Sequence, residues 1–403
     1  MTKVLIIGPG NSPIPATKGG AVETLIEYIV KENEIDPKID LSVASIYEEE
    51  SSKEAKNFKN TKFYQYKVSW FVSLLDRLTC WIAKNILRKK KILAYRYIFQ
   101  RLHFARYCKR LMKKIPFDKV IMENHVLLLR AFKGKKIQKL YKGKYYYHEH
   151  NEIRTDLGCT DVVMNAKKII TVSNYISNSF MNKYPEYNKD NVVKLSNVAD
   201  ISRFGKEYDL SSLKEKYNIK EENKIVLFAG RLDKEKGALE ALNAFNMLED
   251  KNARLMIVGS YCYGHKMSNG FEEELYALAE KNKDRIIFTG FIPFDEMPKI
   301  YKLADVIVLP SIWNDPAPLS IIEAISSGKC LITTNSGGIR EYASECAIVL
   351  NRDEELVSNI HKNLVELLNN DPLRLSYEER AKEVTKNWTT NKFFNDFLDI
   401  IKD

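Results

Sequence analysis

Short runs of β-branched and other apolar residues alternate with longer amphipathic stretches along most of the chain. The first series of apolar runs lies at 4–7, 41–44, 119–122, 145–148 and 168–172. A second series lies at 225–229, 254–258, 285–289, 305–309 and 330–333. Strands that alternate with helical segments are typical of βαβ units and a parallel sheet. The pattern therefore predicts an α/β protein built from two Rossmann-like halves.

The length of 403 residues is more than one hydrophobic core usually supports, which also indicates two domains. A charged, turn-rich segment at 206–223 separates the two series and predicts a connector with an amphipathic helix. Apolar residues make up 45% of the chain, which excludes a disordered or collagen-like protein. We expect the first domain at 1–205 and the second from residue 206 onward.

The first apolar run ends at a Gly-Pro-Gly sequence that offers only part of a dinucleotide-binding fingerprint. Pro13 stands where that fingerprint needs its third glycine, so an NAD site is disfavoured. A helical apolar period over 21–30 begins directly after Gly19 and Gly20. Two glycines before a helix let backbone amides approach an anion. A plain turn is the alternative interpretation of the same residues.

Charge is distributed unevenly between the two halves. Residues 1–205 have a net charge of +17 and residues 206–403 one of −7. The segment 77–117 has 13 Lys and Arg and no acid, interleaved with aromatic and aliphatic residues. This composition favours docking on anionic lipid, while a helical pair with core aromatics and solvated charges stays open. No nucleic-acid-binding motif accompanies the segment, so we expect no nucleic-acid partner.

The cysteines are scattered, without a C-x-x-C pair or a nearby histidine at zinc-finger spacing. They are Cys80, Cys108, Cys159, Cys262, Cys330 and Cys346. We therefore expect a reducing compartment, no disulfide framework and no structural zinc. The apolar run at the N-terminus is too short for a signal-peptide core, and no stretch of about 18 apolar residues predicts a membrane span. These features predict a cytoplasmic protein.

Two positively charged residues follow the strand expected at 225–229. Arg231 and Lys236 lie in a glycine-bounded loop that precedes a helix expected at 238–245. Ligands of open α/β sheets bind at this carboxyl edge. A guanidinium and an ammonium together suit a diphosphate, although a solvated charge run is the alternative.

Two acids flank the start of another helix in the second half. Asp315 and Glu323 are eight residues apart, and the helix is expected to begin near Leu319. Carboxylates accept hydrogen bonds from pairs of hydroxyls, such as those of a sugar or a ribose. The two acids could thus face two parts of one extended ligand. Acid pairs at this spacing also occur often by chance.

Together these segments resemble a GT-B fold glycosyltransferase of family 4, the nucleotide-sugar-dependent group that builds bacterial envelope, capsule and spore-coat polysaccharides. The resemblance covers nearly the whole chain. It rests on Lys18-Gly19-Gly20-Ala21, His148-Glu149-His150-Asn151, Val172-Ser173-Asn174, Asn197-Val198-Ala199-Asp200 before Phe204, Gly230-Arg231 with Lys236-Gly237, and Pro310-Ser311 with Glu323-Ala324 and Gly328. It implies two Rossmann-like domains that face a central cleft, with a second domain at 206–385 and a helix at 386–403 that crosses back to the first.

The resemblance also implies which residues bind the donor. They are Gly19, Gly20, Arg231, Lys236, Ile292, Pro318, Leu319, Ser320 and Glu323. An amide at Gly20 would meet the donor diphosphate, and Arg231 and Lys236 would clamp its phosphates. Backbone at Ile292 would read the nucleobase, and Glu323 would hold the ribose hydroxyls. Because these positive groups can stabilise the diphosphate, and because no D-x-D follows an apolar strand, we expect no metal and no cofactor.

A catalytic set follows from the same resemblance: His150, Asp315, Arg231 and Lys236. His150 would lie near the donor sugar, with His148 as its supporting neighbour, and Asp315 would contact the sugar near its anomeric carbon. Three positions depart from the family pattern. Asp315 replaces the usual Glu, Ala317-Pro318 replaces the frequent Phe-Gly, and Asn197-Val198-Ala199-Asp200 lacks the usual glycine.

These expectations describe a metal-independent, retaining hexosyltransferase of cell-surface polysaccharide biosynthesis. It would transfer a sugar from a nucleotide-diphosphate donor, with a UDP-sugar favoured, to a glycan or lipid-linked acceptor. Such an enzyme would work at the inner face of the membrane, docked through 77–117. Two alternatives stay open: a GT-B sugar-nucleotide epimerase, and a catalytically silent nucleotide-sugar-binding subunit of an assembly complex.

Overall fold

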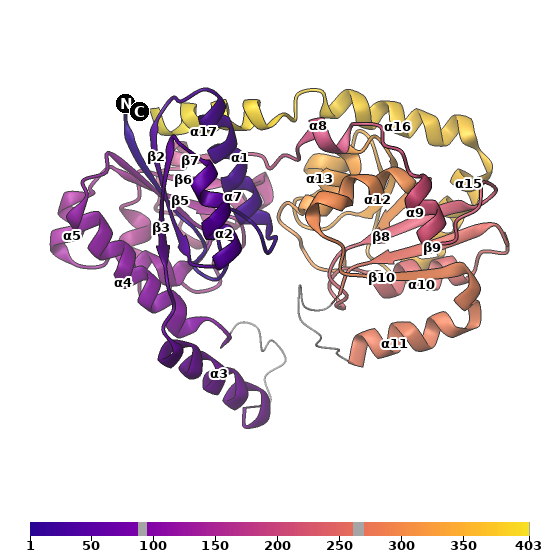
Figure 1. The fold of residues 1–403 in the computed structure, drawn as a ribbon, viewed down its shortest axis with the longest axis horizontal. Coiled ribbons are helices and arrows are strands. Elements are labelled where there is room, and N and C mark those ends of the chain that lie inside the picture. Colours follow the sequence, from indigo (N-terminus) through magenta and orange to yellow (C-terminus); the bar gives the residue numbers. More distant parts are fainter. Residues whose placement is uncertain (88–94, 261–269, 403) are drawn as a thin grey trace. The chain divides into compact units, whose positions relative to one another are not determined.

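The computed structural model describes residues 1–87, 95–260 and 270–402 (Figure 1). The chain divides into two compact units, one made of Met1–Ser196 with Phe394–Asp403 and the other of Asn197–Phe393. Each unit is built on a parallel sheet with helices on both faces, as alternating strands and helices require. The prediction of an α/β protein with two Rossmann-like domains is confirmed.

The first unit contains a seven-stranded parallel sheet in the order β3-β2-β1-β4-β5-β6-β7. Its strands are β1 (Lys3–Ile7), β2 (Asp40–Ile46), β3 (Thr61–Tyr66), β4 (Lys119–Glu123), β5 (Tyr145–Glu149), β6 (Lys168–Thr171) and β7 (Val192–Lys194). The five predicted runs of this half form β1, β2, β4, β5 and β6. The two edge strands, β3 and β7, were not predicted.

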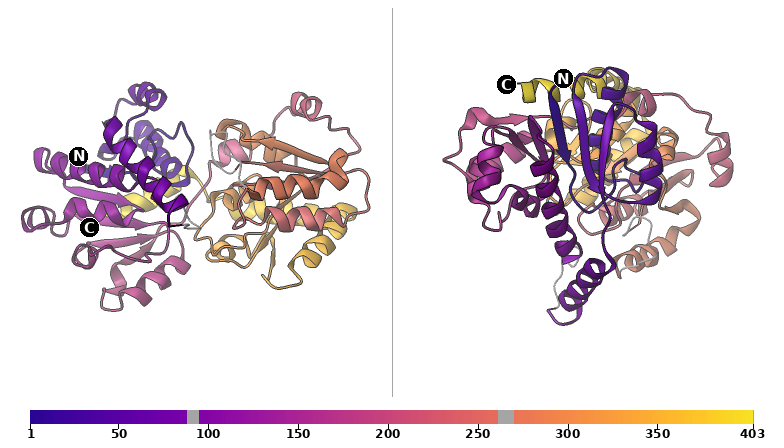
Figure 2. Two further views of the ribbon diagram at one scale, coloured as in Figure 1. Left: turned by 90° about the horizontal axis from the view of Figure 1, so that it is seen from below. Right: turned by 60° about the vertical axis from the view of Figure 1, so that its left-hand side comes forward.

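Helices cover both faces of this sheet (Figures 1 and 2). They are α1 (Ala21–Ile35), α2 (Glu49–Glu54), α3 (Trp70–Asn85), α4 (Ile98–Lys114), α5 (Lys135–Leu140), α6 (Thr160–Met164), α7 (Asn174–Lys183) and the C-terminal α17 (Thr390–Lys402). Because strand side chains alternate, Tyr145 and Tyr147 pack into the core shared with α4 and α7. Tyr146 faces the other way, and its hydroxyl lies 3.5 Å from the carbonyl of Ile401 on α17. The C-terminal helix therefore returns to the first unit, as expected.

The second unit contains a six-stranded parallel sheet in the order β10-β9-β8-β11-β12-β13. Its strands are β8 (Lys224–Ala229), β9 (Ala253–Val258), β10 (Ile286–Gly290), β11 (Val306–Leu309), β12 (Cys330–Thr334) and β13 (Ile348–Leu350). Its helices are α8 (Ile201–Phe204), α9 (Ser211–Lys216), α10 (Ala238–Asn246), α11 (Gly270–Ala279), α12 (Met297–Leu303), α13 (Leu319–Ser326), α14 (Ile339–Ala343), α15 (Leu356–Asn369) and α16 (Asp371–Thr385). All five predicted runs are strands, and the edge strand β13 was again not predicted.

The second unit begins at Asn197, ahead of the boundary expected after residue 205. The Asn197 side-chain amide donates to the carbonyl of Ala317 at 3.0 Å, and its backbone N–H donates to the Tyr342 hydroxyl at 3.1 Å. Phe204 is fully buried, with its ring 5.8 Å from that of Tyr301. These contacts make 197–205 part of the second core, although sequence charge and turn content change only after it.

The basic segment 77–117 contains two helices with different surroundings, while its residues 88–94 lie outside the described part of the chain. Phe104, Cys108 and Met112 on α4 are fully buried in the core of the first unit. On α3, by contrast, large apolar side chains are exposed. The core-helix interpretation thus describes α4 but not α3. Within the described residues, no helix combines the length and the apolar character needed to cross a bilayer.

Candidate functional site

In the second unit, the loop between β8 and α10 brings Lys236 to the carboxyl edge of the sheet. Gly237, the N-cap of α10, has φ +80°, a conformation that side chains with a Cβ disfavour. A Cβ at this position would also clash with the carbonyl of Pro310, which follows the neighbouring strand β11. Glycine therefore allows the two loops that follow β8 and β11 to lie against each other.

Four of the predicted site residues line one small hollow in these loops: the donor-binding Lys236, Pro318 and Ser320 and the catalytic Asp315. The Lys236 ammonium forms an ion pair with the Asp315 carboxylate, and Asp315 is only 7% exposed. Pro318 is the N-cap of α13, and Leu319 and Ser320 begin that helix. The hollow thus combines an ammonium with a helix N-terminus, and both attract an anion.

Arg231 and Ile292 lie near this edge but make other contacts. The Arg231 guanidinium is 3.3 Å from the Asp233 carboxylate, which is two residues along the same loop. Ile292 follows the end of β10 and is half-buried. Neither residue lines the hollow around Lys236 and Asp315. Of the two cations predicted to bind the diphosphate, only Lys236 lines this hollow. The role of Arg231 stays a prediction.

Glu323 is buried on α13 and is held by a residue that the sequence did not single out. The Tyr301 hydroxyl on α12 donates to the Glu323 carboxylate at 3.1 Å. Burial raises the pKa of Glu323 to about 7, although this hydrogen bond and the charge of Arg203 oppose the rise. A carboxyl group kept in this state can either donate or accept hydrogen bonds near neutral pH.

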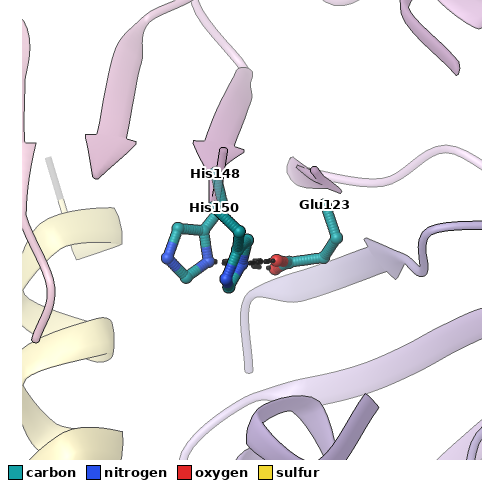
Figure 3. A group of neighbouring side chains, drawn as sticks. All are labelled: Glu123, His148 and His150. Atoms are coloured by element: carbon teal, nitrogen blue, oxygen red, sulfur yellow. Dashed lines mark hydrogen bonds and ion pairs between the residues drawn. The ribbon is translucent and has the colours of Figure 1, made fainter. Parts of the chain in front are cut away.

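In the first unit, two histidines and a glutamate meet at the carboxyl ends of β4 and β5 (Figure 3). Parallel pairing places Glu123 opposite His148. His150 Nε2 lies 2.8 Å and His148 Nδ1 3.0 Å from Glu123 Oε2, and both imidazoles point toward that carboxylate. All three side chains are at least 93% buried. The three residues are of types that bind metal ions. However, both imidazole nitrogens already lie within hydrogen-bond distance of the Glu123 carboxylate.

The histidines keep Glu123 ionised. Its burial opposes ionisation, yet the His148 imidazole and the hydrogen bonds from both histidines lower the pKa of Glu123 to about 2. Burial, followed by the His148 charge, lowers the pKa of His150 to about 4. At neutral pH, His150 is therefore a neutral imidazole whose Nε2–H donates to the ionised Glu123 carboxylate. This arrangement fixes the ring and its tautomer.

The Glu23 carboxylate lies directly against the predicted glycine loop, Gly19–Gly20, of the first unit. Gly19 and Gly20 precede α1, with φ angles of +70° and +120°. A Cβ at Gly20 would clash with the Glu23 carboxylate, which bonds to its own backbone N–H and to the Ser12 hydroxyl. Burial raises the pKa of Glu23 to about 7. An anion bound at this helix N-terminus would therefore meet Glu23.

The sequence analysis missed Glu123, Tyr301 and Glu23. Glu123 had a detectable signal, because an acid that directly follows a buried apolar strand lies at the ligand-binding edge of a parallel sheet. Glu23 also had one, since it is the third residue of a helix whose N-cap is glycine. Tyr301 had none, because its contact with Glu323 joins two helices through tertiary packing.

Comparisons with known proteins show similarity to glycosyltransferases. Residues 211–384 match the family described as Glycosyl transferases group 1. The chain is 25% identical to spore coat protein SA of Bacillus subtilis over 358 residues, which cover 85% of this chain and 83% of that protein. It is 24% identical to lipopolysaccharide 1,2-N-acetylglucosaminetransferase of Salmonella typhimurium over 269 residues, or 66% and 67% of the two chains.

Solved structures show the same fold over the full length. Anabaena Alr3699/HepE in complex with UDP and glucose superimposes with a TM-score of 0.74 and 15% identity, and the match covers 100% of both chains. WaaG, a glycosyltransferase involved in lipopolysaccharide biosynthesis, gives a TM-score of 0.68 and 14% identity over 99% of each chain. The group 1 domain at 211–384, the curated relatives and the shared fold together support a GT-B glycosyltransferase.

Proposed function

We propose that this protein is a retaining hexosyltransferase that uses a nucleotide-diphosphate sugar without a metal ion. The observation that supports the proposal most strongly is the hollow at the N-terminus of α13. There Lys236 and Asp315, 79 residues apart in sequence, form a partly buried ion pair beside Pro318 and Ser320. Structural neighbours solved with UDP or UDP-glucose make a UDP-sugar the first donor to test.

Phosphate binding would change the partner of Lys236. Its ammonium forms an ion pair with the Asp315 carboxylate. A diphosphate at the α13 N-terminus would accept hydrogen bonds from the same ammonium and from amides near Leu319. Asp315 would then be released toward the hydroxyls of the donor sugar. The positive potential of Lys236, Arg231 and the helix dipole would stabilise the leaving diphosphate, so that no metal is required.

His150 would act on the sugar as a neutral group. Because its Nε2 proton is engaged by Glu123, its Nδ1 atom is left as a hydrogen-bond acceptor. An oriented neutral imidazole can accept a hydrogen bond from a sugar hydroxyl and stabilise positive charge that develops near the anomeric carbon. Glu123 would be the positioning residue that holds this tautomer, in the manner of an acid behind a catalytic histidine. The incoming hydroxyl would attack from the side of the leaving phosphate, which would take up its proton.

The acceptor is proposed to be a glycan or a lipid-linked glycan used in cell-surface polysaccharide biosynthesis. Two relatives support this class by name, one as a spore coat protein and one as a lipopolysaccharide glycosyltransferase. We expect the enzyme to meet such an acceptor at an anionic membrane surface through the region of 77–117. A silent nucleotide-sugar-binding subunit is the second candidate, supported by the replacement of the usual glutamate by Asp315.

One experiment separates these candidates and tests the mechanism. The full chain is incubated with UDP-glucose and simple glycan acceptors, with and without EDTA, and products are followed by proton NMR. The proposal predicts EDTA-insensitive turnover and an α-linked product from the α-linked donor. A β-linked product would contradict retention, loss of activity in EDTA that Mg²⁺ restores would contradict metal independence, and binding without turnover of any nucleotide sugar would favour the silent subunit.

A further inference from the structure

The helix α3 exposes a row of large apolar side chains that the fold of the first unit does not explain. Five large side chains on this helix are between 49% and 77% exposed: Trp70, Phe71, Leu74, Leu78 and Trp81. Their spacing of three and four residues places them on one side of the helix. Monomeric proteins rarely expose contiguous apolar patches of this kind unless they bind something.

The opposite side of α3 is fixed to the rest of the unit. Val72, Asp76 and Ala83 are buried, and the Ser69 hydroxyl caps the helix by accepting from the Val72 N–H. The Asp76 carboxylate accepts from the backbone N–H groups of Phe99 and Gln100 at 2.8 and 2.9 Å. It thereby caps the N-terminus of α4, where a negative charge is favourable.

This contact sets the direction in which the apolar face points. Gln100 in turn donates to the carbonyl of Gly10 at 3.0 Å, which ties α4 to the loop after β1. Figures 1 and 2 show α3 beyond the end of α4, at one end of the first unit. The five apolar side chains are therefore held outward by the fold, and they do not belong to its core.

Charge indicates what covers this face. Asp76 is the only acid of α3, and it is buried and already engaged. Arg77 and Lys84 are exposed beside the apolar side chains, and no Asp or Glu occurs in 77–117. An apolar face with tryptophan near both ends and a basic flank matches the interface of an anionic bilayer, where indole rings lie at the headgroup level.

We propose that α3 is an interfacial membrane anchor, which inserts Trp70, Phe71, Leu74, Leu78 and Trp81 into the surface of an anionic bilayer. This deepens the proposed function, on which it rests for the place where the acceptor is met. It also moves the docking element, because α4 contributes core residues and exposed charges but no free apolar face. Insertion and charge attraction act together, so both neutral lipid and high salt should weaken binding.

The test is co-sedimentation of the full chain with vesicles of phosphatidylcholine alone or with 30% phosphatidylglycerol, roughly the anionic range that such surfaces need. The key variant is Leu74→Ser with Leu78→Ser, which removes exposed side chains and leaves the buried face of α3 unchanged. Its matched control is Leu140→Ser with Leu375→Ser, because these leucines are 46% and 49% exposed elsewhere on the protein. A second pair compares Arg77→Glu with Lys84→Glu against Lys135→Glu with Lys136→Glu on α5.

We expect the two α3 variants to bind anionic vesicles at least about tenfold more weakly than the parent. Both control variants should bind like the parent. Tryptophan fluorescence should shift to the blue on vesicle binding, and Trp70→Phe with Trp81→Phe should abolish the shift. Binding that is equal on neutral vesicles, or unchanged in the leucine variant, would overturn the proposal. So would a parent chain that ignores vesicles and instead forms a dimer that the leucine variant dissociates.

The failure of this proposal and that of the proposed function can be told apart. Release of the nucleoside diphosphate from a soluble nucleotide sugar does not involve α3, so every α3 variant should keep the parent rate. Loss of vesicle binding with normal donor turnover supports both proposals. Normal vesicle binding without turnover of any nucleotide sugar would contradict the proposed function only.

Discussion

The two units present charged groups at the carboxyl edges of similar sheets, but in different states. In the first unit, Glu123 and His150 are buried and satisfy one another, with their pKa values held far from neutrality. In the second, the Lys236 ammonium forms an ion pair with Asp315 at a small hollow that Ser320 also lines. The first edge fixes one protonation state, whereas we propose that the second exchanges an internal anion, Asp315, for the donor diphosphate.

The difference predicts a division of labour between the units. A preorganised, neutral histidine contributes to the rate of the chemical step more than to substrate affinity. A lysine that exchanges a carboxylate for a phosphate contributes to both. Substitutions at the two edges should therefore separate turnover from donor affinity.

The largest effect is expected from Lys236→Met. Removal of the ammonium takes away a phosphate contact and leaves the buried Asp315 carboxylate without its cation. We expect kcat/KM to fall by about 10³-fold, with donor affinity lower as well. Steady-state kinetics and calorimetry measure the two quantities. Lys234→Met is the control, because Lys234 is two residues away and its side chain is 75% exposed.

His150→Ala should affect turnover alone. We expect kcat to fall by about 10²-fold while donor affinity stays within twofold, because the imidazole acts on charge that develops during the reaction. His103→Ala, on α4 of the same unit, is the control. Equal turnover in His150→Ala and the parent would remove His150 from the catalytic set. A loss of affinity without loss of turnover would reverse the assigned division of labour.

Stability should depend on pH through the buried acid Glu149. Burial raises its pKa from 4.5 to about 8, and its Oε2 atom has no hydrogen-bond partner among the residues that the structure describes. The native state then holds a proton that the unfolded state has lost, so the free energy of unfolding should fall as pH rises from about 4.5 to 8. Glu149→Gln should remove this loss, so that at pH 8.5 its free energy of unfolding exceeds that of the parent by roughly 2–4 kcal/mol.

Urea unfolding at pH 5 and pH 8.5 measures this effect. The gap between Glu149→Gln and the parent should open with rising pH, whereas Glu186→Gln, an exposed acid of the same unit, should follow the parent at both values. A gap of the same size at pH 5 would show that the substitution acts through packing and would contradict the assigned protonation.

The smallest effect is expected at the glycine loop of the first unit. Glu23 has a pKa of about 7 and faces Arg101 and Glu123, so it gains negative charge as pH rises from 6 to 8.5. If the donor diphosphate meets Gly20 as predicted, donor affinity should fall about fivefold over this range. Glu23→Gln should make this fall smaller and leave only the part that Glu323 contributes, because the pKa of Glu323 is also about 7. UDP-glucose is a suitable probe because its diphosphate does not titrate there. The same pH slope in parent and variant would place the diphosphate away from Gly20.

The sequence predicted the inner strands of both sheets and the edge strand β10, but not the edge strands β3, β7 and β13. Inner strands of a parallel sheet are apolar on both faces and give continuous apolar runs. The edge strand β3 mixes polar and aromatic residues, and β7 and β13 have only three residues each. Such segments cannot be told from loops by composition alone.

The site was predictable wherever a motif is local. Lys236, Pro318, Ser320 and Glu323 lie within short, ordered segments that resemble a known family, and the structure brings the first three together. The ion pair of Lys236 with Asp315 and the contact of Glu323 with Tyr301 depend on packing between distant segments. Neither follows from spacing, because partners many residues apart become neighbours only through the order of the strands.

The most direct test of the account is a thermal-shift and hydrolysis screen of the full chain against UDP-, GDP- and dTDP-sugars in EDTA, run in parallel on Lys236→Met and Lys234→Met. The account predicts that one nucleotide sugar stabilises the parent and Lys234→Met and slowly releases its diphosphate, while Lys236→Met shows neither effect. Stabilisation and release that persist in Lys236→Met would contradict the assignment of the donor phosphates to the hollow at α13.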